Sequence, residues 1–201
     1  MRIEIIRHGR TMLQEEHRYV GRTDDPLSPA GAHELEAASH IPTHVYVTSL
    51  QRTRQTAELI FPGACLVEVS GLEEMDFGTA EGRTHQEMME QDADYRAWVE
   101  NGCVGRCPGG ESRDEFSARV CDAFTRLVHE AQSQDMDVLT IVAHGGTIMA
   151  VMDCFGIPRR EFFSWQTKHG CGLMLDDSAW EREHTLRLIS ETDHRRKDSQ
   201  Q

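Results

Sequence analysis

Residues 138–143, with the sequence VLTIVA, form an almost continuous apolar run of the length of a β-strand. Alternate side chains of a strand point to opposite faces of its sheet, so a run of this kind indicates a strand that is buried on both faces. Strands buried in this way are typical of sheets with helices packed on both sides. The run therefore favours a central sheet between two helical layers.

The rest of the chain alternates between strand-like and helix-like patterns. Short β-rich runs occur at residues 2–6, 45–47, 66–69, 172–175 and 186–189. Helical patterns lie at residues 30–40, 50–60, 84–100, 113–131 and 145–155. The alternation predicts an α/β fold, a three-layer α/β/α sandwich with a largely parallel central sheet. The last two strand-like runs follow each other directly and are expected to add an antiparallel edge.

Length and composition fit one domain. The chain has 201 residues, of which 38% are hydrophobic, and a chain of this size buries enough surface to form a core without metal or disulfide staples. We expect a single catalytic domain over residues 1–190. Residues 191–201 (ETDHRRKDSQQ) contain no apolar side chain and are expected to form a disordered tail.

The formal net charge of −13 limits the partners. A strongly acidic chain repels the phosphate backbone of nucleic acids and anionic membrane surfaces, so neither is an expected partner. The first residues lack the apolar stretch of a signal peptide, and six scattered cysteines then indicate reduced thiols. These features predict a cytoplasmic protein. A small anionic ligand would need a local concentration of Arg, Lys or backbone N–H groups.

Two strand ends carry the same residue pair. His8-Gly9 follows the first strand, and His144-Gly145 follows the buried strand at 138–143. Ligands of such sheets bind at the carboxyl ends of the strands, so His8 and His144 converge if their strands are neighbours. The helix that begins after His144 directs its N-terminal N–H groups to the same place, which favours an anion.

Six sequence blocks, in order along residues 2–190, resemble the histidine phosphatase superfamily, which includes cofactor-dependent phosphoglycerate mutases. The blocks are RHGRT at 7–11, DPLSPAG at 25–31, TSLQR at 48–52 with QTAE at 55–58, EMDFG at 74–78 with EG at 81–82, PGGES at 108–112 and VAHGG at 142–146. Within the superfamily the chain is most similar to α-ribazole phosphatases of cobalamin synthesis. That similarity comes from the 74–81 run, from DYRAW at 94–98 and from HGCG at 169–172.

The resemblance implies a role for each of five residues. His8 would be the nucleophile that forms a phosphohistidine, which requires a neutral ring with its tautomer set by a hydrogen bond. Arg7, Arg52 and His144 would hold the phosphoryl oxygens, with His144 working best when protonated. Glu74 would be the general acid that protonates the leaving group and then activates water.

Nearby residues compete for two of these roles. Arg54 competes with Arg52, although positions two apart on a helix point in different directions, so only one can face the site. Glu73 and Glu81 compete with Glu74. The motif spacing favours Arg52 and Glu74.

Further residues are candidates for contacts with the substrate. Gln14, Thr11 and the backbone N–H of Gly145 fall where the family places phosphate contacts. Two positions depart from the family pattern. Arg10 replaces the usual Glu or Gln and is expected to point to solvent, and Ala80 replaces a Trp, which alters the expected wall of the site.

Residues 84–110 are expected to form a lid-like insertion over the pocket. Tyr95 and Trp98 lie one helical turn apart within it. Either could shape the leaving-group side of the site, although packing within their own helix is the simpler use of both.

The predicted function is a metal-independent phosphomonoesterase for a small phosphorylated metabolite, with α-ribazole 5′-phosphate as the preferred substrate. No cofactor and no metal are expected, because Cys103 and Cys107 lack a second ligand pair at zinc-site spacing. The alternatives are a broad-specificity sugar-phosphate phosphatase, a cofactor-dependent phosphoglycerate mutase and a binding module with an inactive site. The chain is shorter than mutases usually are, chiefly in the segment after Gly82, and this favours the phosphatase. A homodimer is compatible with the family, several of whose members dimerise.

Overall fold

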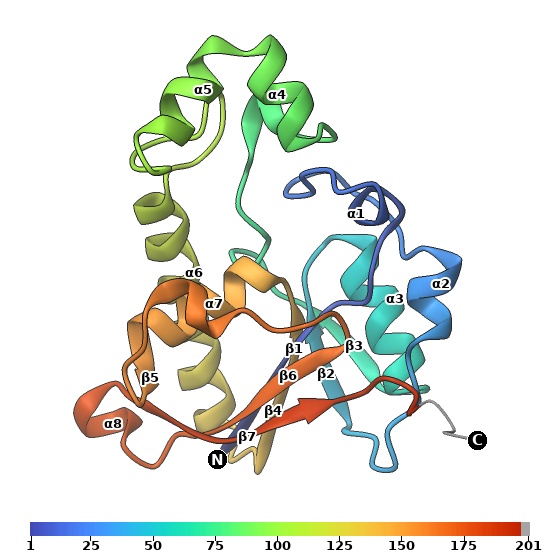
Figure 1. The fold of residues 1–201 in the computed structure, drawn as a ribbon. Coiled ribbons are helices and arrows are strands. Elements are labelled where there is room, and N and C mark those ends of the chain that lie inside the picture. Colours follow the sequence, from blue (N-terminus) through green and yellow to red (C-terminus); the bar gives the residue numbers. More distant parts are fainter. Residues whose placement is uncertain (198–201) are drawn as a thin grey trace.

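The computed structural model describes residues 1–197. Its centre is a seven-stranded sheet with the strand order β3-β2-β4-β1-β6-β7-β5 (Figure 1). The strands are β1 (Arg2–Arg7), β2 (His44–Val47), β3 (Cys65–Glu68), β4 (Val138–Ala143), β5 (Gly156–Ile157), β6 (Cys171–Asp176) and β7 (Leu186–Asp193). The buried strand predicted at 138–143 is β4, and it lies between β2 and β1.

The sheet is mixed and mostly parallel. Strands β1, β2, β3 and β4 run parallel to one another, and β5 runs parallel to β7. Strand β6 pairs antiparallel with both β1 and β7. The antiparallel edge expected from the last two strand-like runs is therefore present, and it places β6 directly beside the strand that carries Arg7.

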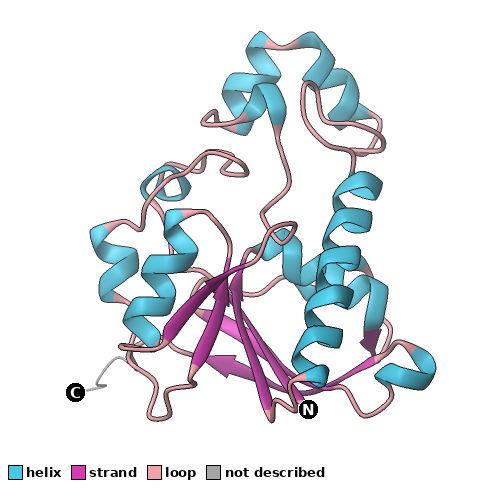
Figure 2. Ribbon diagram, turned by 180° about the vertical axis from the view of Figure 1, so that it is seen from behind, coloured by secondary structure: helices cyan, strands magenta, loops and turns pink. Residues whose placement is uncertain are grey.

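Helices cover both faces of the sheet, as Figures 1 and 2 show. The α-helices are α1 (Met12–Glu15), α2 (Pro29–His33), α3 (Gln51–Ile60), α4 (His85–Gln91), α5 (Ala93–Glu100), α6 (Arg113–Ser133), α7 (Gly145–Phe155) and α8 (Trp180–Glu183). Two short 3₁₀ helices, η1 (Gly78–Ala80) and η2 (Phe162–Trp165), complete the elements. The predicted three-layer α/β/α sandwich is confirmed.

Alternation along β1 divides the core between the two layers. Ile3 and Ile5 belong to the larger apolar cluster, which includes side chains of α6 and α7, whereas Ile6 belongs to the smaller cluster with side chains of α3. Each face of the strand therefore buries its own apolar residues, which fixes the register of β1 against its neighbours. The fixed register also determines where β1 ends along the sheet, and therefore where His8 lies.

Helices α4 and α5 stand apart from both layers, beyond the carboxyl end of the sheet (Figure 1). They enclose a separate small core of Ala80, Met88 and Tyr95, against which Tyr19, Phe77 and Trp98 pack. The Tyr95 hydroxyl lies 2.7 Å from that of Tyr19 and 2.8 Å from Nδ1 of His85. Tyr95 thus holds this region together from inside.

Two of the predicted helices differ in the structure. The helix expected at residues 30–40 ends at His33, because Leu35 turns inward and the chain then bonds to Ile60 through the N–H of Ala38. The helix expected at 84–100 is interrupted at Asp92, whose carboxylate accepts a hydrogen bond from the N–H of Tyr95 and so caps α5. A new N-cap is a sufficient reason for one helix to end and another to begin.

The prediction of a disordered tail from residue 191 is wrong for residues 191–197, whereas residues 198–201 lie outside the described part of the chain. Strand β7 continues to Asp193 because its backbone pairs with β6, whatever the polarity of its side chains. Beyond it, His194 Nε2 lies 2.9 Å from Oε1 of Glu4, and the N–H of Arg196 donates to the carbonyl of Glu34. Hydrogen bonds therefore hold this segment in place, although it contains no apolar side chain.

Candidate active site

His8 lies at the carboxyl end of β1, where it is 1% exposed. Its backbone N–H donates to the carbonyl of Ala143 at the end of β4, at 3.0 Å. Its ring Nδ1 lies 2.6 Å from the carbonyl oxygen of Gly9. A carbonyl only accepts, so Nδ1 carries the proton and Nε2 keeps its lone pair. The tautomer needed for attack by Nε2 is therefore set by the loop after β1.

Two arginines, the half-buried Arg7 and the fully buried Arg52, lie beside this histidine. Arg7 donates from Nη1 to the carbonyl of Thr167 at 2.7 Å, while its buried Nε has no hydrogen-bond partner within residues 1–197. Arg52, fully buried at the start of α3, donates to the carbonyls of Gly21 and Thr23 at 2.7 and 2.8 Å. Burial lowers the pKa of both guanidinium groups, and the Glu74 carboxylate opposes that effect.

His144 faces His8 across the pocket, with their ring centroids 5.2 Å apart. As predicted, the two His-Gly pairs converge because β1 and β4 are neighbours. Nδ1 of His144 accepts a hydrogen bond from Arg52 Nε at 3.3 Å, so the proton of the neutral ring is on Nε2, 3.0 Å from the Thr48 hydroxyl.

The electrostatics of the pocket keep both histidines neutral. Burial, followed by the positive charge of Arg52, lowers the pKa of His8 and of His144 well below the usual 6.5. The two arginines thus supply the positive charge of the pocket, and the imidazoles do not add to it. This arrangement suits an anionic ligand and a nucleophile that must be unprotonated.

Glu74 reaches the pocket from the segment after β3. Its carboxylate accepts hydrogen bonds of 3.0 Å from the N–H of Gly146 and of 3.0 Å from its own neighbour Met75. A Cβ at Gly146 would lie 2.1 Å from Oε1 of Glu74, so glycine is required for this approach. A Cβ at Gly145 would likewise lie 3.1 Å from the guanidinium of Arg7. The start of α7 is therefore shaped around both side chains.

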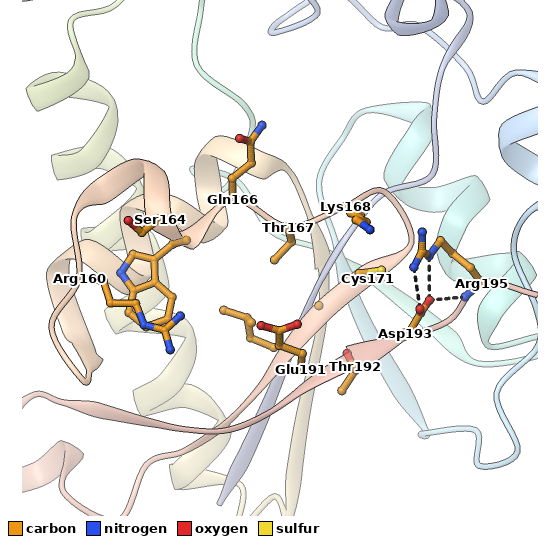
Figure 3. Close-up of a pocket in the computed structure, with 13 residues that line it drawn as sticks. Arg160, Ser164, Gln166, Thr167, Lys168, Cys171, Glu191, Thr192, Asp193 and Arg195 are labelled. Atoms are coloured by element: carbon orange, nitrogen blue, oxygen red, sulfur yellow. Dashed lines mark hydrogen bonds and ion pairs between the residues drawn. The ribbon is translucent and has the colours of Figure 1, made fainter. Parts of the chain in front are cut away.

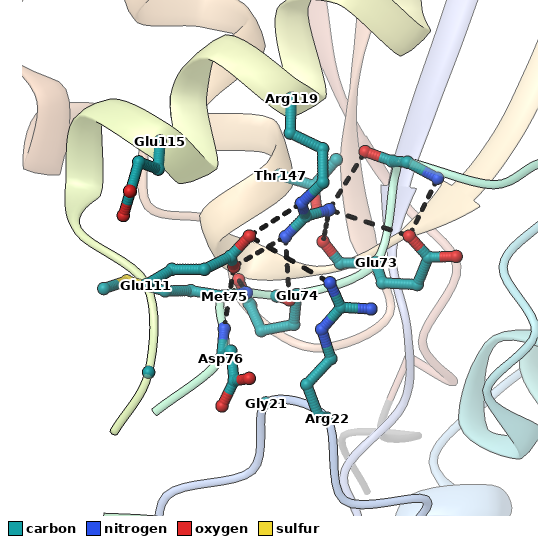
Figure 4. Close-up of polar contacts among 12 residues, drawn as sticks. Gly21, Arg22, Glu73, Glu74, Met75, Asp76, Glu111, Glu115, Arg119 and Thr147 are labelled. Atoms are coloured by element: carbon teal, nitrogen blue, oxygen red, sulfur yellow. Dashed lines mark hydrogen bonds and ion pairs between the residues drawn. The ribbon is translucent and has the colours of Figure 1, made fainter. Parts of the chain in front are cut away.

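Arg119 of α6 holds the backbone that carries Glu74, as Figure 4 shows. Its guanidinium donates to the carbonyls of Glu73 and Glu74 at 3.1 and 3.3 Å. It also binds the Glu111 carboxylate through Nε and Nη2, at 2.9 and 2.8 Å. Such a two-pronged pair fixes geometry as well as charge.

The competing residues are engaged elsewhere. Glu73 accepts from the N–H of Gly71 and lies 3.6 Å from Arg119. Arg54 points away from Arg52 and pairs with Glu68 at the surface.

Glu81, the other competitor, binds the N–H groups of Gly21, Arg22 and Thr23 and so shapes the loop whose carbonyls receive Arg52. Burial alone would raise the pKa of Glu81, but the hydrogen bonds from Thr23 and the loop N–H groups outweigh it and lower that pKa.

The predicted binding residues surround the loop after His8. Gly145 stands at the N-terminus of α7, beside Arg7. Thr11 is buried, and its hydroxyl has no partner among the described residues. The side-chain oxygen of Gln14 accepts from the N–H of Thr11 at 3.2 Å, which starts α1. Arg10, expected in solvent, is half-exposed and pairs with Glu34.

A cavity of about 300 Å³ opens from Arg7, Glu74, Gly145 and Gly146. The rest of its wall is largely apolar. Its side chains come from the loop after α1, from the segment after β3, from the α4–α5 region, and from α6, α7 and η2. They are Tyr19, Met75, Phe77, Trp98, Cys103, Arg113, Phe116, Met149, Phe162, Phe163 and Gln166. Trp98 therefore lines the cavity, whereas Tyr95 and Ala80 belong to the separate core of the α4–α5 region.

A third histidine, whose position the sequence interpretation missed, lies beside the nucleophile candidate. The ring of His169 is 5.4 Å from that of His8, and its Nδ1 lies 3.1 Å from the carbonyl oxygen of His8. Burial and the charge of Arg7 lower the pKa of His169 to about 4. One sequence signal could have found it: His169-Gly170 is a third His-Gly pair, after His8-Gly9 and His144-Gly145.

A second cavity, of about 270 Å³, lies between the segment 164–168 and strand β7 (Figure 3). Arg195 closes one end by pairing with the Asp193 carboxylate. None of the predicted site residues lines it, so it does not contribute to the arrangement around His8.

The part of the chain from residue 1 to residue 197 contains no cluster of three or more His, Cys, Asp or Glu side chains suited to a metal ion. Nor does it contain a helix with the length and hydropathy of a membrane span.

The model of the histidine phosphatase superfamily (branch 1) matches residues 3–184. The probable phosphoglycerate mutase GpmB of Salmonella paratyphi C (strain RKS4594) is 33% identical over 154 residues, which are 72% of this chain and 70% of that protein.

Solved structures of two further proteins are similar. The α-ribazole phosphatase from Shigella flexneri matches with a TM-score of 0.78 and 25% identity, covering 96% of this chain and 97% of that one. A phosphoglycerate mutase from Thermus thermophilus matches with a TM-score of 0.67 and 26% identity, covering 96% and 98%. With its paired strand-end histidines and the two arginines beside them, the chain belongs to branch 1 of the histidine phosphatase superfamily.

Proposed function

We propose that this protein is a metal-independent phosphomonoesterase that works through a phosphohistidine at His8, with α-ribazole 5′-phosphate as the favoured substrate. The observation that carries the proposal is the apolar cavity that opens beside Arg7 and Glu74. A phosphate at the arginines would place its ester group in this cavity, where aromatic side chains suit a large apolar leaving group.

In the first step His8 Nε2 attacks phosphorus, the P–N bond forms and the bond to the ester oxygen breaks. Arg7 and Arg52 stabilise the charge on the phosphoryl oxygens, which is the main requirement of phosphoryl transfer. Glu74 gives its proton to the departing alkoxide. A bound phosphate dianion would also oppose the arginines and favour protonation of His144, which then becomes a further donor.

In the second step Glu74, now a carboxylate, takes a proton from water as the water oxygen attacks phosphorus. The P–N bond breaks, and inorganic phosphate leaves a neutral His8. The hydrogen bond from Nδ1 of His8 to the Gly9 carbonyl keeps the same tautomer through both steps.

A phosphoglycerate mutase is the second candidate, because the GpmB relative carries that name. A mutase must hold two anionic groups of its substrate and keep the phosphoryl group for return. Among the cavity side chains the cations are Arg7 and Arg113, and Arg113 lies over the Phe162 ring at 5.5 Å. This wall favours an apolar group over a second anion.

The test is phosphate release from α-ribazole 5′-phosphate in excess chelator, with the His8→Ala variant as the control. We expect release that the substitution abolishes. In parallel, interconversion of 3- and 2-phosphoglycerate is measured with the bisphosphorylated primer present. Interconversion without net phosphate release would refute the phosphatase proposal and support the mutase. Release from other phosphate esters, but not from α-ribazole 5′-phosphate, would refute only the substrate.

A further inference from the structure

The segment 167–170 binds the Arg7-His8 dipeptide at three points. The Thr167 carbonyl accepts from Arg7 Nη1 at 2.7 Å, and the N–H of Gly170 donates to the Arg7 carbonyl at 3.0 Å. The third contact is between the ring Nδ1 of His169 and the carbonyl oxygen of His8, at 3.1 Å. A carbonyl accepts, so Nδ1 of His169 carries its proton and donates.

The third contact lies where the β-ladder between β1 and β6 ends. The ladder pairs Ile6 with Gly172, and the bond from Gly170 to Arg7 extends it by one step. His8 is one residue further and almost completely buried, so its carbonyl needs a partner away from water. The side chain of His169 takes the place that a strand N–H would otherwise have.

This contact leaves a single free polar atom on His8. Within residues 1–197 the backbone N–H binds Ala143, the carbonyl binds His169, and ring Nδ1 binds the Gly9 carbonyl. The ring also lies between those of His144 and His169, at 5.2 and 5.4 Å. His169 therefore holds the carbonyl of His8 and flanks one side of its ring.

We infer that His169 is a positioning residue for the nucleophile: its Nδ1–H and ring fix the His8–Gly9 peptide unit so that Nε2 of His8 faces the phosphoryl group. The inference rests on the proposed role of His8. His169 contacts His8 and is not among the residues that line the apolar cavity, which leaves recognition of the ester group to other side chains.

Two substitutions separate the hydrogen bond from mere packing. His169→Leu retains the approximate size of the side chain but removes its hydrogen-bond donor. His169→Asn keeps an N–H donor at about the position of Nδ1. His194→Leu is the matched control: it removes a histidine that contacts Glu4 on the same strand β1, away from His8. Thermal melts establish that each variant is folded.

Single-turnover formation of the phosphoenzyme is the first readout. We expect His169→Leu to slow it about a hundredfold with KM changed less than threefold, because small misplacement of a reacting atom is costly. His169→Asn should recover the rate to within about tenfold of the wild type, and His194→Leu should leave it unchanged. An unchanged rate in His169→Leu, or equal losses in all three variants, would overturn the inference.

Imidazole ¹⁵N NMR of the protein without substrate is the second readout, with His8→Gln used to assign the signals. The wild type should show His8 as a single Nδ1–H tautomer, and His169→Leu should show averaging between tautomers. An unchanged His8 signature in a folded His169→Leu protein would overturn the inference. If the wild type forms no phosphoenzyme with any ester, the proposed function fails, while the NMR comparison still tests the positioning.

Discussion

Trp98 contributes an indole ring to the cavity beside Arg7 and Glu74, and its buried Nε1 has no hydrogen-bond partner within the described chain. We expect Trp98→Ala to lower kcat/KM for 1-naphthyl phosphate about tenfold, which corresponds to about 1.4 kcal/mol of lost apolar contact. For β-glycerol phosphate, whose leaving group is small and polar, kcat/KM should change less than twofold. Steady-state kinetics on both esters check this.

Trp98→Phe is the control, since it keeps an aromatic ring and should keep most of the activity on the naphthyl ester. Equal losses on both esters would mean that Trp98 supports the fold of the α4–α5 region and leaves the ester group without a specific contact. The separate core around Tyr95 makes that alternative physically reasonable.

The first turn of helix α7 binds the Glu74 carboxylate and also begins the helix, so its effects on catalysis and on stability can be measured separately. Gly146→Ala places a methyl group 2.1 Å from the original position of Glu74 Oε1, at the flexible end of that side chain. We expect the carboxylate to shift and kcat to fall about a hundredfold, the scale of a lost general acid. The free energy of unfolding should change by less than about 1 kcal/mol, because alanine is the better helix former.

Urea titrations and kinetics measure the two effects, and Glu74→Gln supplies a double-mutant cycle. Adding Gly146→Ala to Glu74→Gln should cost little further activity, since both changes remove the same group. Full additivity of the two losses would show that the methyl group acts elsewhere, for instance on the neighbouring Phe116 ring.

At the scale of elements, the sequence was informative where burial alone decides the structure. The boundaries of β4 follow from its apolar run, and the convergence of His8 and His144 follows from the carboxyl-end rule once β1 and β4 are neighbours. Long-range contacts decided the rest. No local sequence signal ends α2 at His33, and no apolar residue indicates that β7 continues to Asp193.

The predicted site shows the same division. Helical periodicity allows only one of Arg52 and Arg54 to face the site, and the motif spacing favours Arg52. The structure buries Arg52 completely and places Arg54 at the surface. The role of His169 could not be derived in that way, because its partner is a backbone carbonyl 161 positions away. Every residue has a backbone carbonyl, so the sequence does not show which one a side chain will bind.

At the scale of the whole molecule, two buried histidines and the half-buried His169 link stability to pH. The pKa values of His8, His144 and His169 are all lowered from 6.5, that of His169 to about 4. Below pH 6.5 the unfolded chain takes up protons that the native state does not, so stability falls as pH falls. Each such histidine contributes a slope of up to about 1.4 kcal/mol per pH unit.

Urea unfolding at intervals between pH 7.5 and 4 measures that slope. His169→Asn should reduce it by the contribution of one proton in the window from pH 6.5 to 4, and leave it unchanged above pH 7. A variant with the wild-type slope would show that His169 is protonated in the native state as readily as in the unfolded chain.

The sheet order has a consequence for how the protein is made. The Arg7-His8 dipeptide is synthesised well before its partners, because the carbonyl of Thr167 and the ring of His169 lie 160 and 161 positions later. Bonds that close such long loops form late, because the entropy of closure must be met first. A nascent chain therefore carries His8, the proposed nucleophile, long before the contacts that position it can form, since these require β6 to insert beside β1.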